Sequence, residues 1–574
     1  MKHNFKIHKD HKVTLGRISQ FFQRESTGVH QAAFLLGSAT LLTKILALLR
    51  DRLLASAFGA GETLDIYYAS FRLPDLLFTI FLFLAASTAL IPILFREEKK
   101  GQEDSRIFIG NIASWFLVLM AAASIILFFL MPSLTKIISP GFSPENQQQL
   151  VVLTRILILQ VLFLGISNIV SSVIQAYRRF LIYALSPLLY NLGIIFGILF
   201  LYPKMGTPGL AIGAVIGAFL HFSVQLPSLF SLGFRPYFSL KITPAIKETV
   251  RLSAPRTLGL SLNQLTFIAI TAIASTLGAG SIAIFNLAYN LQGVPLSVIG
   301  VSYSVAAFPF LARANGKEHN NEFITYIYGA LRHILFWALP ATALMIVLRA
   351  QIVRVILGSG NFGWADTRLT AAALAIFSAS LFAQSLILLY SRSFYAAGKT
   401  VAPVIINALG TIFIISSSFL LLSIFDASEG FKIWFENILR VTDVKTTKIL
   451  LLTTSFSLGS LLNLALLAFI FHKIWGTIKN GAFRDSILQI IFASVVTGVI
   501  SYFALRILDN IFDINTFVGI SAQGLISALA GLGAGGVLLL LLKNKEIYEV
   551  KSALLRQFWK TPVVATEPPV GTDL

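Results

Sequence analysis

Charged residues are concentrated in the first two long apolar segments of the chain. The first carries Lys44, Arg50, Asp51 and Arg52, and the second carries Asp65, Arg72 and Asp75. If these segments cross a membrane, each charge there is costly and marks a functional position. Lys44 and Asp51 are seven residues apart, so they lie on similar faces of a helix. Arg binds phosphate oxygens in a bidentate way. These residue types therefore predict an interior surface that binds an anionic head group such as a pyrophosphate.

Some of these charges have simpler structural explanations, which stay open at this stage. Arg50 and Arg52 stand near the expected outer end of their segment, where long side chains can snorkel to the interface. Arg72 and Asp75 flank a proline and could form a structural pair beside a kink. Lys44 stands near the middle of its segment, too deep for snorkelling to explain it.

The second half of the chain is poorer in membrane charges. Arg256 follows a proline near the start of the seventh apolar segment, and Asn263 and Gln264 lie one to two turns deeper. No segment of this half carries an Asp or Glu near its middle. Asp51 and Asp65 are therefore the carboxylates that we consider for a coupling ion.

The composition is that of an integral membrane protein. Of the 574 residues, 56% are hydrophobic and 12% are charged, and the mean hydropathy is +0.79. A soluble chain carries roughly 25% charged residues. Apolar runs of about 20 residues recur from end to end, which is long enough to cross a bilayer. Backbone groups in lipid must satisfy their own hydrogen bonds, so these runs predict helices, and a β-barrel would show shorter alternating segments.

We expect an all-α integral membrane protein of about fourteen transmembrane helices. The expected spans are 31–58, 66–95, 107–131, 149–176, 181–202, 207–232, 250–277, 282–311, 322–348, 367–395, 401–425, 448–472, 486–507 and 517–542. An even number places both termini on the same side of the membrane.

The positive charge of the chain sets the expected orientation. The formal net charge is +19, and Lys and Arg gather in alternate loops and in both tails. The positive-inside rule then makes both termini cytoplasmic, and it explains the basic charge without nucleic acid as a partner. The opposite loops are poor in Lys and Arg except for 426–447. That long outer loop has helical apolar spacing, and it either lies in the outer interface or caps the bundle.

The sequence lacks the residues that several classes of chemistry require. The chain has no Cys, so thiol chemistry, disulfides and Cys-based metal sites are excluded. The eight His are scattered, and no His and carboxylate cluster has metal-site spacing. Neither a P-loop nor a GxSxG motif is present. We therefore expect no enzyme, no cofactor and no bound metal.

A short internal repeat relates the two halves of the chain. Residues 55–61 (ASAFGAG) resemble residues 274–280 (ASTLGAG), which follow 219 residues and six helices later. Copies six helices apart enter the membrane in the same direction. They predict two pseudo-symmetric six-helix lobes with a substrate site between them. The last two helices fall outside the repeat.

Several short motifs, in order, are similar to those of the MurJ/MviN family of the multidrug/oligosaccharidyl-lipid/polysaccharide exporter superfamily. They are Lys44 with Arg50-Asp51, residues 58–61 (FGAG), Asp65, residues 71–75 (FRLPD), 140–142 (PGF), 186–191 (SPLLYN), 209–213 (GLAIG), 225–227 (QLP), 255–260 (PRTLGL) with Gln264, and 392–396 (RSFYA). The resemblance covers most of the chain. It implies a two-lobed, 14-helix bundle with a cationic central cavity and a lipid-tail groove on the last two helices.

The resemblance and the repeat together divide the chain. We expect a basic cytoplasmic N-terminal segment at 1–30, a first lobe at 31–232 and a second lobe at 247–477. The lipid-tail groove would follow at 485–543 and a cytoplasmic tail at 544–574.

The chain departs from the family pattern at four places. Phe78 stands where the family often has an Arg, and 83–84 (FL) replaces a Glu-Gly pair. Asn290 stands at an expected cavity Arg of the eighth helix, and Ile270 at a carboxylate of the seventh. The expected cavity is therefore less cationic than is usual in the family, and a sodium site at Ile270 is in doubt.

The resemblance implies a flippase for the peptidoglycan precursor lipid II in the bacterial cytoplasmic membrane, working by alternating access. Lys44, Arg50, Asp51, Arg72 and Arg256 would bind the pyrophosphate-sugar head group. Asn263, Gln264 and Asn290 would contact sugar or peptide. The partners would be a polyprenyl-pyrophosphate-linked glycan lipid, membrane lipids and the cell-wall synthesis machinery, with the protein itself a monomer.

Three alternatives remain. A cation-coupled exporter of another lipid-linked oligosaccharide or a small molecule has the same fold and needs a membrane carboxylate. A membrane glycosyltransferase needs a catalytic cluster on an outer loop, which is not seen. A scaffold that recruits partners through its tails gives no reason for charges inside the first helix.

Overall fold

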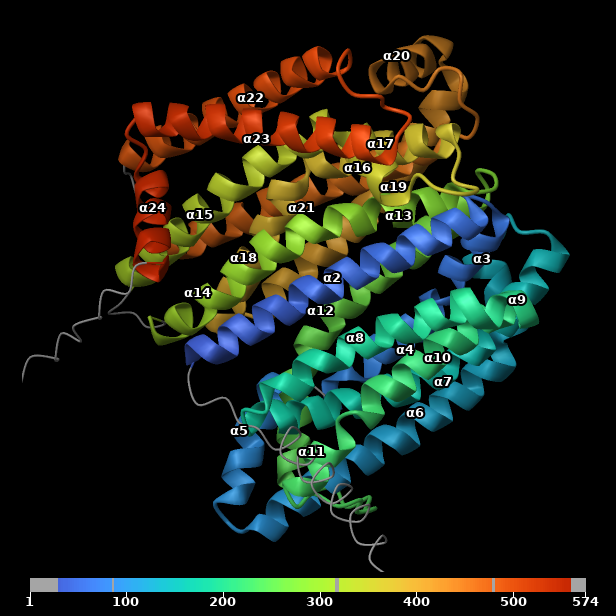
Figure 1. Cartoon of the computed structure of the whole chain (residues 1–574). Coiled ribbons are helices and arrows are strands. Elements are labelled where there is room, and N and C mark those ends of the chain that lie inside the picture. Colours follow the sequence, from blue (N-terminus) through green and yellow to red (C-terminus); the bar gives the residue numbers. More distant parts are fainter. Residues whose placement is uncertain (1–28, 85–86, 315–319, 477–480, 559–574) are drawn as a thin grey trace, which may run out of the picture.

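The described part of the chain is helical, as the apolar runs predicted. The computed structural model describes residues 29–84, 87–314, 320–476 and 481–558, and these ranges contain no strand (Figure 1). The expected basic segment at 1–30, apart from its last two residues, lies outside them, as does the tail from Thr561 onwards.

The helices of the first half follow one another with short connections. They are α2 (Val29–Phe58), α3 (Glu62–Ser70), α4 (Arg72–Phe81), η1 (Leu82–Leu84), α5 (Ser87–Glu98), α6 (Gln102–Ile138), α7 (Pro144–Ala176), α8 (Phe180–Phe196), η2 (Gly197–Leu201), α9 (Tyr202–Met205), α10 (Thr207–Ser223) and α11 (Leu226–Ser231).

The second half repeats this pattern and adds two long helices and a short one. Its members are α12 (Pro244–Ser275), α13 (Ser281–Pro295), η3 (Leu296–Val301), α14 (Ser302–Arg313), α15 (Asn320–Val347), α16 (Arg349–Leu357), α17 (Trp364–Ala379), α18 (Leu381–Ala396), α19 (Val401–Ala427), α20 (Glu429–Leu439), α21 (Ile449–Trp475), α22 (Gly481–Leu508), α23 (Phe517–Leu541) and α24 (Lys545–Phe558).

The count of membrane spans is close to the expected fourteen. Within the described residues, twelve stretches are long and apolar enough to cross a membrane, and the α17–α18 pair, bent by 44°, makes a thirteenth if it is one span. These thirteen correspond to thirteen of the expected spans. The remaining expected span is α2, which is 30 residues long and carries Lys44, Arg50, Asp51 and Arg52.

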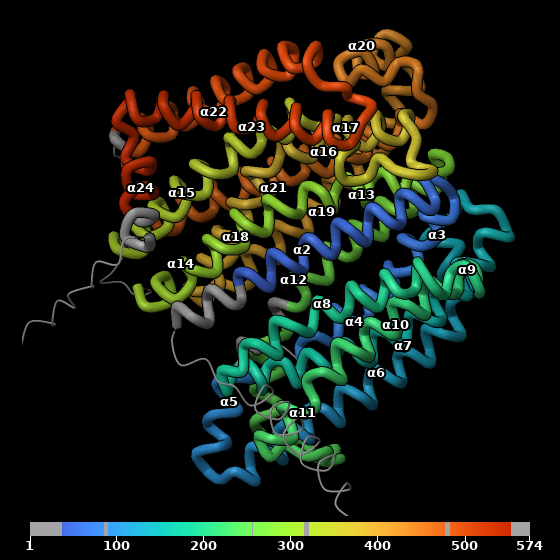
Figure 2. The backbone as a smooth tube through the Cα atoms, viewed as in Figure 1, coloured from blue at the N-terminus to red at the C-terminus, as the bar shows by residue number. Residues whose placement is uncertain are grey.

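The helices form two packed groups with α2 between them. In Figures 1 and 2 the blue α2 runs between the group of α6, α7, α8 and α10 and the group of α13 to α21. α2 packs along α8, and at its far end it also contacts α16. The red helices α22 and α23 pair with each other and cover α15. This is the two-lobe arrangement with two added helices that the repeat predicted.

Small residues let the helices of the first lobe approach closely. A Cβ built on Gly193 of α8 would lie 2.2 Å from the Cα of Gly217, and one on Gly213 of α10 would lie 2.5 Å from the Cα of Gly197. Lipid tails are as apolar as Leu, so helices in a membrane associate through such close contacts rather than through the hydrophobic effect. The four glycines therefore fix α8, and the η2 segment that follows it, against α10.

One buried core is shared between the two lobes. It contains Leu54 of α2 and Leu64 of α3 together with Phe285 of α13, Phe377 of α17 and Phe456 of α21, all nearly or fully buried. This shared core gathers at the end of the bundle where α2 ends. The lobes are therefore closed against each other at that end.

Two amphipathic helices lie outside the spans. α20 occupies the expected outer loop 426–447, and its Phe435 is buried while Trp434 and Ile438 remain exposed. It thus packs on the bundle with one face and leaves apolar side chains on the other. α24, which the sequence did not predict, follows α23 in the expected tail. Glu546 of α24 forms an ion pair with Arg332 of α15 at 3.2 Å.

Candidate functional site between the lobes

Arg50 and Asp51 form the centre of a polar network in the second half of α2. Arg50 donates from Nε and Nη2 to Oδ1 of Asp51, at 2.9 and 2.7 Å. Asp51 Oδ2 accepts a hydrogen bond from Nδ2 of Asn290 on α13 at 3.0 Å. Nη1 of Arg50 donates to Oδ1 of Asn191 on α8 at 3.3 Å. The network joins the two lobes and compensates the charge of Arg50.

Lys44 lies on the same helix without such compensation. It is half-buried, and it forms no ion pair or hydrogen bond within the described residues. Six residues separate it from Arg50, which is about 9 Å along a helix. A cation without a partner in a low-dielectric site attracts an anion strongly. Lys44 is therefore the cation of α2 that is most available to an anionic head group.

Arg72 is a buried cation whose hydrogen-bond partners are neutral side chains. It is 8% exposed. Its Nε donates to Thr271 Oγ1 of α12 at 2.8 Å, and its Nη2 donates to Asn286 Oδ1 of α13 at 2.6 Å. The guanidinium also lies over the ring of Phe267, 5.1 Å from its centroid. Arg72 does not form the ion pair with Asp75 that the flanking proline suggested, because its guanidinium group donates to residues of the other lobe.

Asp75 is consequently left without a hydrogen-bonded partner for its carboxylate. This half-buried carboxylate forms no hydrogen bond or ion pair in the part of the chain that the structure describes. It lies one turn from Arg72 in α4. From the sequence alone, Asp75 was considered only as a structural group. Among the described carboxylates of the first two spans, it is the one whose oxygens accept no hydrogen bond from the protein.

Asp65 joins the two lobes at the end of the bundle where α2 ends. Its Oδ2 accepts from the amide of Gly280 and its Oδ1 from the amide of Ala283, both at 2.7 Å. The side chain is 2% exposed. The first amides of a helix lack intrahelical partners and carry partial positive charge, so a carboxylate there is strongly favoured. Asp65 of α3 thus caps α13 of the other lobe.

The two copies of the sequence repeat meet at this point. Gly280 ends the second copy with φ +86°, and a Cβ on it would lie 2.0 Å from the carbonyl oxygen of Ala60 in the first copy. The Ala60 amide donates to Oδ2 of Asp366 at 3.2 Å. The amide of Asn361 donates to the Ser56 carbonyl at 2.9 Å. The repeat therefore builds the contact that closes one end of the bundle.

Arg52 belongs to the same closed end. Its Nη1 donates to the carbonyl oxygens of Val355 and Ile356, at 2.6 and 3.3 Å, in the last turn of α16. Its guanidinium lies 5.5 Å from the ring centroid of Phe517. A cation is favoured at a helix C-terminus, where carbonyls lack partners. Arg52 therefore binds the second lobe rather than snorkelling to the interface.

The predicted site residues of α12 are less well connected. Asn263 is exposed and Gln264 is half-buried, and neither makes a hydrogen bond within the described residues. Arg256 lies in the helix, but its side chain is outside the described part of the structure. The structure therefore brings Arg50, Asp51 and Asn290 together and leaves the grouping of Asn263, Gln264 and Arg256 with them as a prediction.

Three of the four departures from the family pattern lie in apolar surroundings. Ile270 is 2% exposed and belongs to the core shared by the lobes. Phe78 and Phe83 pack against the core of the first lobe. Asn290 instead keeps a polar role, as the donor to Asp51.

Sequence reasoning missed the neutral partners of the cations. Asn191, Thr271 and Asn286 each accept a hydrogen bond from an arginine. Asn191 stands in one of the family-like motifs, which was a usable signal, whereas Thr271 and Asn286 carry none. In the described ranges no group of three or more His, Asp or Glu side chains could hold a metal ion.

The fold is shared with solved structures of membrane transporters. A solved structure of an inward-facing multidrug resistance MATE family transporter of the MOP superfamily aligns with a TM-score of 0.59 at 15% identity, covering 79% of this chain and 99% of that one. A solved structure of the lipid II flippase MurJ in an inward closed conformation aligns with a TM-score of 0.69 at 22% identity, covering 89% and 99%.

The particular family follows from the sequence match. The family model described as lipid II flippase MurJ matches residues 54–523, so the chain belongs to this family. The lipid II flippase MurJ of Burkholderia cenocepacia is 27% identical over 383 residues, which are 64% of this chain and 73% of that protein. The probable lipid II flippase MurJ of Buchnera aphidicola from Acyrthosiphon pisum is 27% identical over 496 residues, 82% of this chain and 95% of that protein.

Proposed function

We propose that this protein flips lipid II from the inner to the outer leaflet of a bacterial cytoplasmic membrane. The observation that carries the proposal is the family match over residues 54–523. The membrane cations Lys44 and Arg72 support it, because neither forms an ion pair within the described residues and a dianionic pyrophosphate would compensate their charges. Transport of this kind needs no covalent step, so the protein is proposed not to be an enzyme.

The polar network suggests how the head group could act on the lobes. Arg50 is held by Asp51, and Asp51 also binds Asn290 of the second lobe. A pyrophosphate that binds Arg50 and Lys44 competes with Asp51 for the guanidinium. A ligand shifts a conformational equilibrium only by binding one state better. Rearrangement of this network would supply that difference, and the closed contact at Asp65 would open when the lobes change to the other state.

The other predicted contacts are retained in this proposal. Arg256 would add a cation to the head-group site, while Asn263, Gln264 and Asn290 would contact sugar or peptide. The polyprenyl tail would stay in lipid along α22 and α23, within the proposed groove unit 485–543. The proposed lobes are 31–232 and 247–477, flanked by the segments 1–30 and 544–574.

The orientation is also part of the proposal. The Lys/Arg-rich loops make both termini cytoplasmic by the positive-inside rule, which puts the closed contact at Asp65 on the outer side. In this orientation the cytoplasmic end carries Arg96 and α24. We further propose that the protein acts as a monomer and cooperates with the cell-wall synthesis machinery.

A cation-coupled cycle is the second candidate, and Asp75 favours it. Both oxygens of Asp65 accept backbone amides, and both oxygens of Asp51 have side-chain partners. Neither is therefore a good ligand for a cation in this state. The carboxylate of Asp75 has no such partner, so it could take up a proton or a cation. Asp75→Asn should abolish a dependence of transport on an ion gradient, and Glu62→Gln, in an exposed first turn, should leave it unchanged.

Complementation tests the proposed function most directly. A cell depleted of its own lipid II flippase should grow when it expresses this protein, and the purified protein should bind lipid II. Membrane-inserted, folded protein that neither rescues growth nor binds lipid II, and binds a neutral lipid-linked sugar instead, would overturn the assignment.

A further inference from the structure

An apolar pocket lies away from the site between the lobes, near the start of α12. It has a volume of about 370 Å³, which is within the range of small-molecule sites. It is lined by Phe83, Leu84, Trp115, Leu119, Ile242, Ile246, Lys247, Val250 and Arg251. Seven of these side chains are apolar or aromatic, and the two charged ones are both cations. The pocket therefore suits an apolar ligand with a negative charge at one end.

The two cations stand on the same face of α12 as the apolar lining. Lys247 and Arg251 are four residues apart, as are Ile246 and Val250, so each pair is aligned along the helix. Lys247 and Arg251 are exposed and form no ion pair within the described residues. They are thus available to an anion at the mouth of the pocket.

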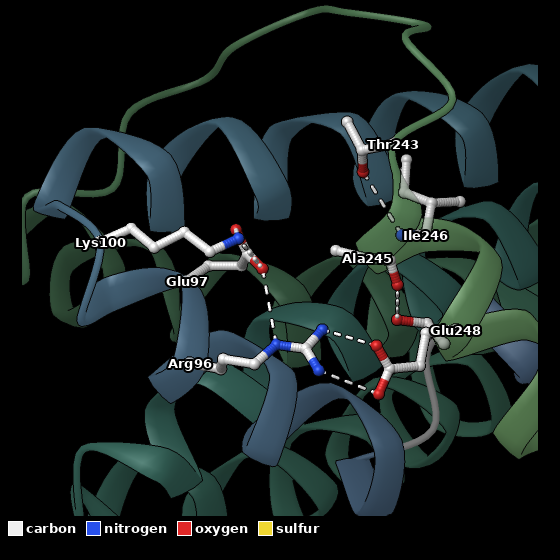
Figure 3. A network of polar contacts seen from close by, with 8 residues as sticks. Arg96, Glu97, Lys100, Thr243, Ala245, Ile246 and Glu248 are labelled. Carbon is white, nitrogen blue, oxygen red and sulfur yellow. Dashed lines mark hydrogen bonds and ion pairs between the residues drawn. The ribbon is translucent and has the colours of Figure 1, made fainter.

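The nearby acids are already engaged elsewhere. Arg96 donates to both oxygens of Glu248, from Nη1 at 3.0 Å and from Nη2 at 2.6 Å (Figure 3). Glu97 accepts from Lys100 at 2.7 and 2.8 Å. Because these carboxylates have their own cations, they do not compensate Lys247 or Arg251.

The start of α12 is also held in a fixed position. Thr243 caps the helix by accepting a hydrogen bond from the amide of Ile246 at 3.4 Å, and the ion pair of Glu248 with Arg96 ties the same turn to α5 (Figure 3). The pocket wall formed by α12 is therefore pre-organised rather than assembled by a ligand.

The surroundings of the pocket also point to a lipid. The segment leading into α12 exposes large apolar side chains, with Phe238 at 69% and Ile242 at 61% exposure. Aromatic and apolar groups beside Lys and Arg are typical of the membrane–water interface. The rim of the pocket therefore has the composition that is expected where lipid head groups meet acyl chains.

We propose that this pocket binds an anionic phospholipid, with an acyl chain against Trp115 and Leu119 and the phosphate on Lys247 and Arg251. The apolar wall disfavours a sugar or a free phosphate, while the cations favour an anionic over a zwitterionic head group. In the proposed orientation this lipid comes from the cytoplasmic leaflet. The site is separate from the Lys44 and Arg50 region, so it does not depend on lipid II being the transported substrate.

Fluorescence quenching tests the acyl-chain contact in the full-length protein. The chain has six Trp, so the signal of Trp115 is the difference between the wild type and Trp115→Phe. In nanodiscs of phosphatidylcholine, a small fraction of phosphatidylglycerol with brominated chains should quench this signal strongly. The same fraction of brominated phosphatidylcholine should quench it weakly. Equal quenching by both lipids would overturn the proposal.

Native mass spectrometry tests the phosphate contact. Lys247→Gln with Arg251→Gln should weaken phosphatidylglycerol binding roughly 30-fold, since each cation near a membrane contributes on the order of a factor of five. The matched control is Lys473→Gln with Lys543→Gln, which makes the same charge change at exposed helix ends elsewhere. Val250→Trp should fill the cavity and abolish binding while keeping both cations.

The outcomes of this test are decisive in both directions. Loss of binding in the Lys247 and Arg251 variant and in Val250→Trp, with binding kept in the control, supports the site. Unchanged binding in either pocket variant overturns it. Displacement of phosphatidylglycerol by polyprenyl phosphate at equal concentration would also overturn it, since the pocket would then belong to the transported lipid. Failure of lipid II binding in a separate assay leaves these results unaffected.

Discussion

The carboxylate of Asp65 and the amide of Gly280 are joined across the two lobes by a hydrogen bond of 2.7 Å. The two residues are 215 positions apart, and each stands at the end of one copy of the sequence repeat or just after it. A short contact between a buried charge and a helix N-terminus can hold two rigid bodies in one arrangement, and its loss favours the other.

Weakening this contact should open the outer end of the bundle. Asp65→Asn removes the charge and leaves one oxygen to serve two amides. A charge-assisted hydrogen bond is worth roughly 1.5–3 kcal/mol, so the open state should be populated roughly tenfold more or higher. The measurement is labelling by a membrane-impermeant maleimide of Ser281→Cys, a buried position in a chain without native Cys. Glu62→Gln is the control, and equal labelling in the Asp65 variant and the control would contradict the role of Asp65.

A methyl group at Gly280 should block the same closure sterically. Gly280 has φ +86°, and a Cβ built on it would lie 2.0 Å from the carbonyl oxygen of Ala60. Gly398 has a similar φ of +71°, but a Cβ built there would have no atom within 4 Å. Ala at either position incurs a left-handed backbone cost of about 1 kcal/mol. Only Gly280→Ala should also lose growth complementation and label rapidly at Ser281→Cys. The idea fails if Gly398→Ala is equally impaired.

Cations with and without partners should respond differently to truncation. Arg50→Ala leaves Asp51 buried and uncompensated, which should cost about 3 kcal/mol and lower Tm clearly. Lys44→Ala removes a cation without an ion pair, so it should keep Tm near that of the wild type while abolishing lipid II binding. Lys136→Ala, at an exposed helix end, is the control for both readouts. A large Tm loss in Lys44→Ala with normal binding would show that Lys44 is structural.

The ion pair of Arg96 with Glu248 should give a defined pH dependence. The hydrogen bond from Arg96 lowers the pKa of Glu248 below its ordinary value of 4.5. A carboxyl group with a lowered folded-state pKa contributes stability above its unfolded pKa and loses it as the pH falls through the folded value. Glu248→Gln should therefore reduce Tm at neutral pH, and the difference from the wild type should shrink as the pH falls below 4.5 and vanish below the folded-state pKa of Glu248. A Tm difference that grows on acidification would contradict this pairing.

Topology reporters should place the two ends of the molecule on opposite sides. A fusion after Thr561 should report a cytoplasmic location, and an insertion at Glu429, at the start of α20, should report the outside. This follows from the distribution of Lys and Arg among the loops. Equal signals from the two sites would contradict the proposed orientation and, with it, the assignment of the Asp65 contact to the outer side.

The sequence by itself determined the class, the family and most of the spans. Hydropathy is a local property of about 20 consecutive residues, and a helix in lipid satisfies its own backbone, so thirteen expected spans reappear as helices. The two repeat copies also predicted the two lobes. The α2 span was expected for the same reason, although its charges set it apart from the other spans.

Only the tertiary structure decided which charges have partners. Arg50 and Asp51 are neighbours in sequence, but Asn290 completes their network from 239 residues away. Arg72 donates to Thr271 and Asn286, which are about 200 residues away in the sequence, and forms no ion pair with Asp75. Asp65, a candidate for the coupling ion, caps a helix of the other lobe. Side-chain hydrogen bonds act over about 3 Å, so they depend on how the lobes pack. No local pattern encodes which residue of the other lobe arrives within that distance.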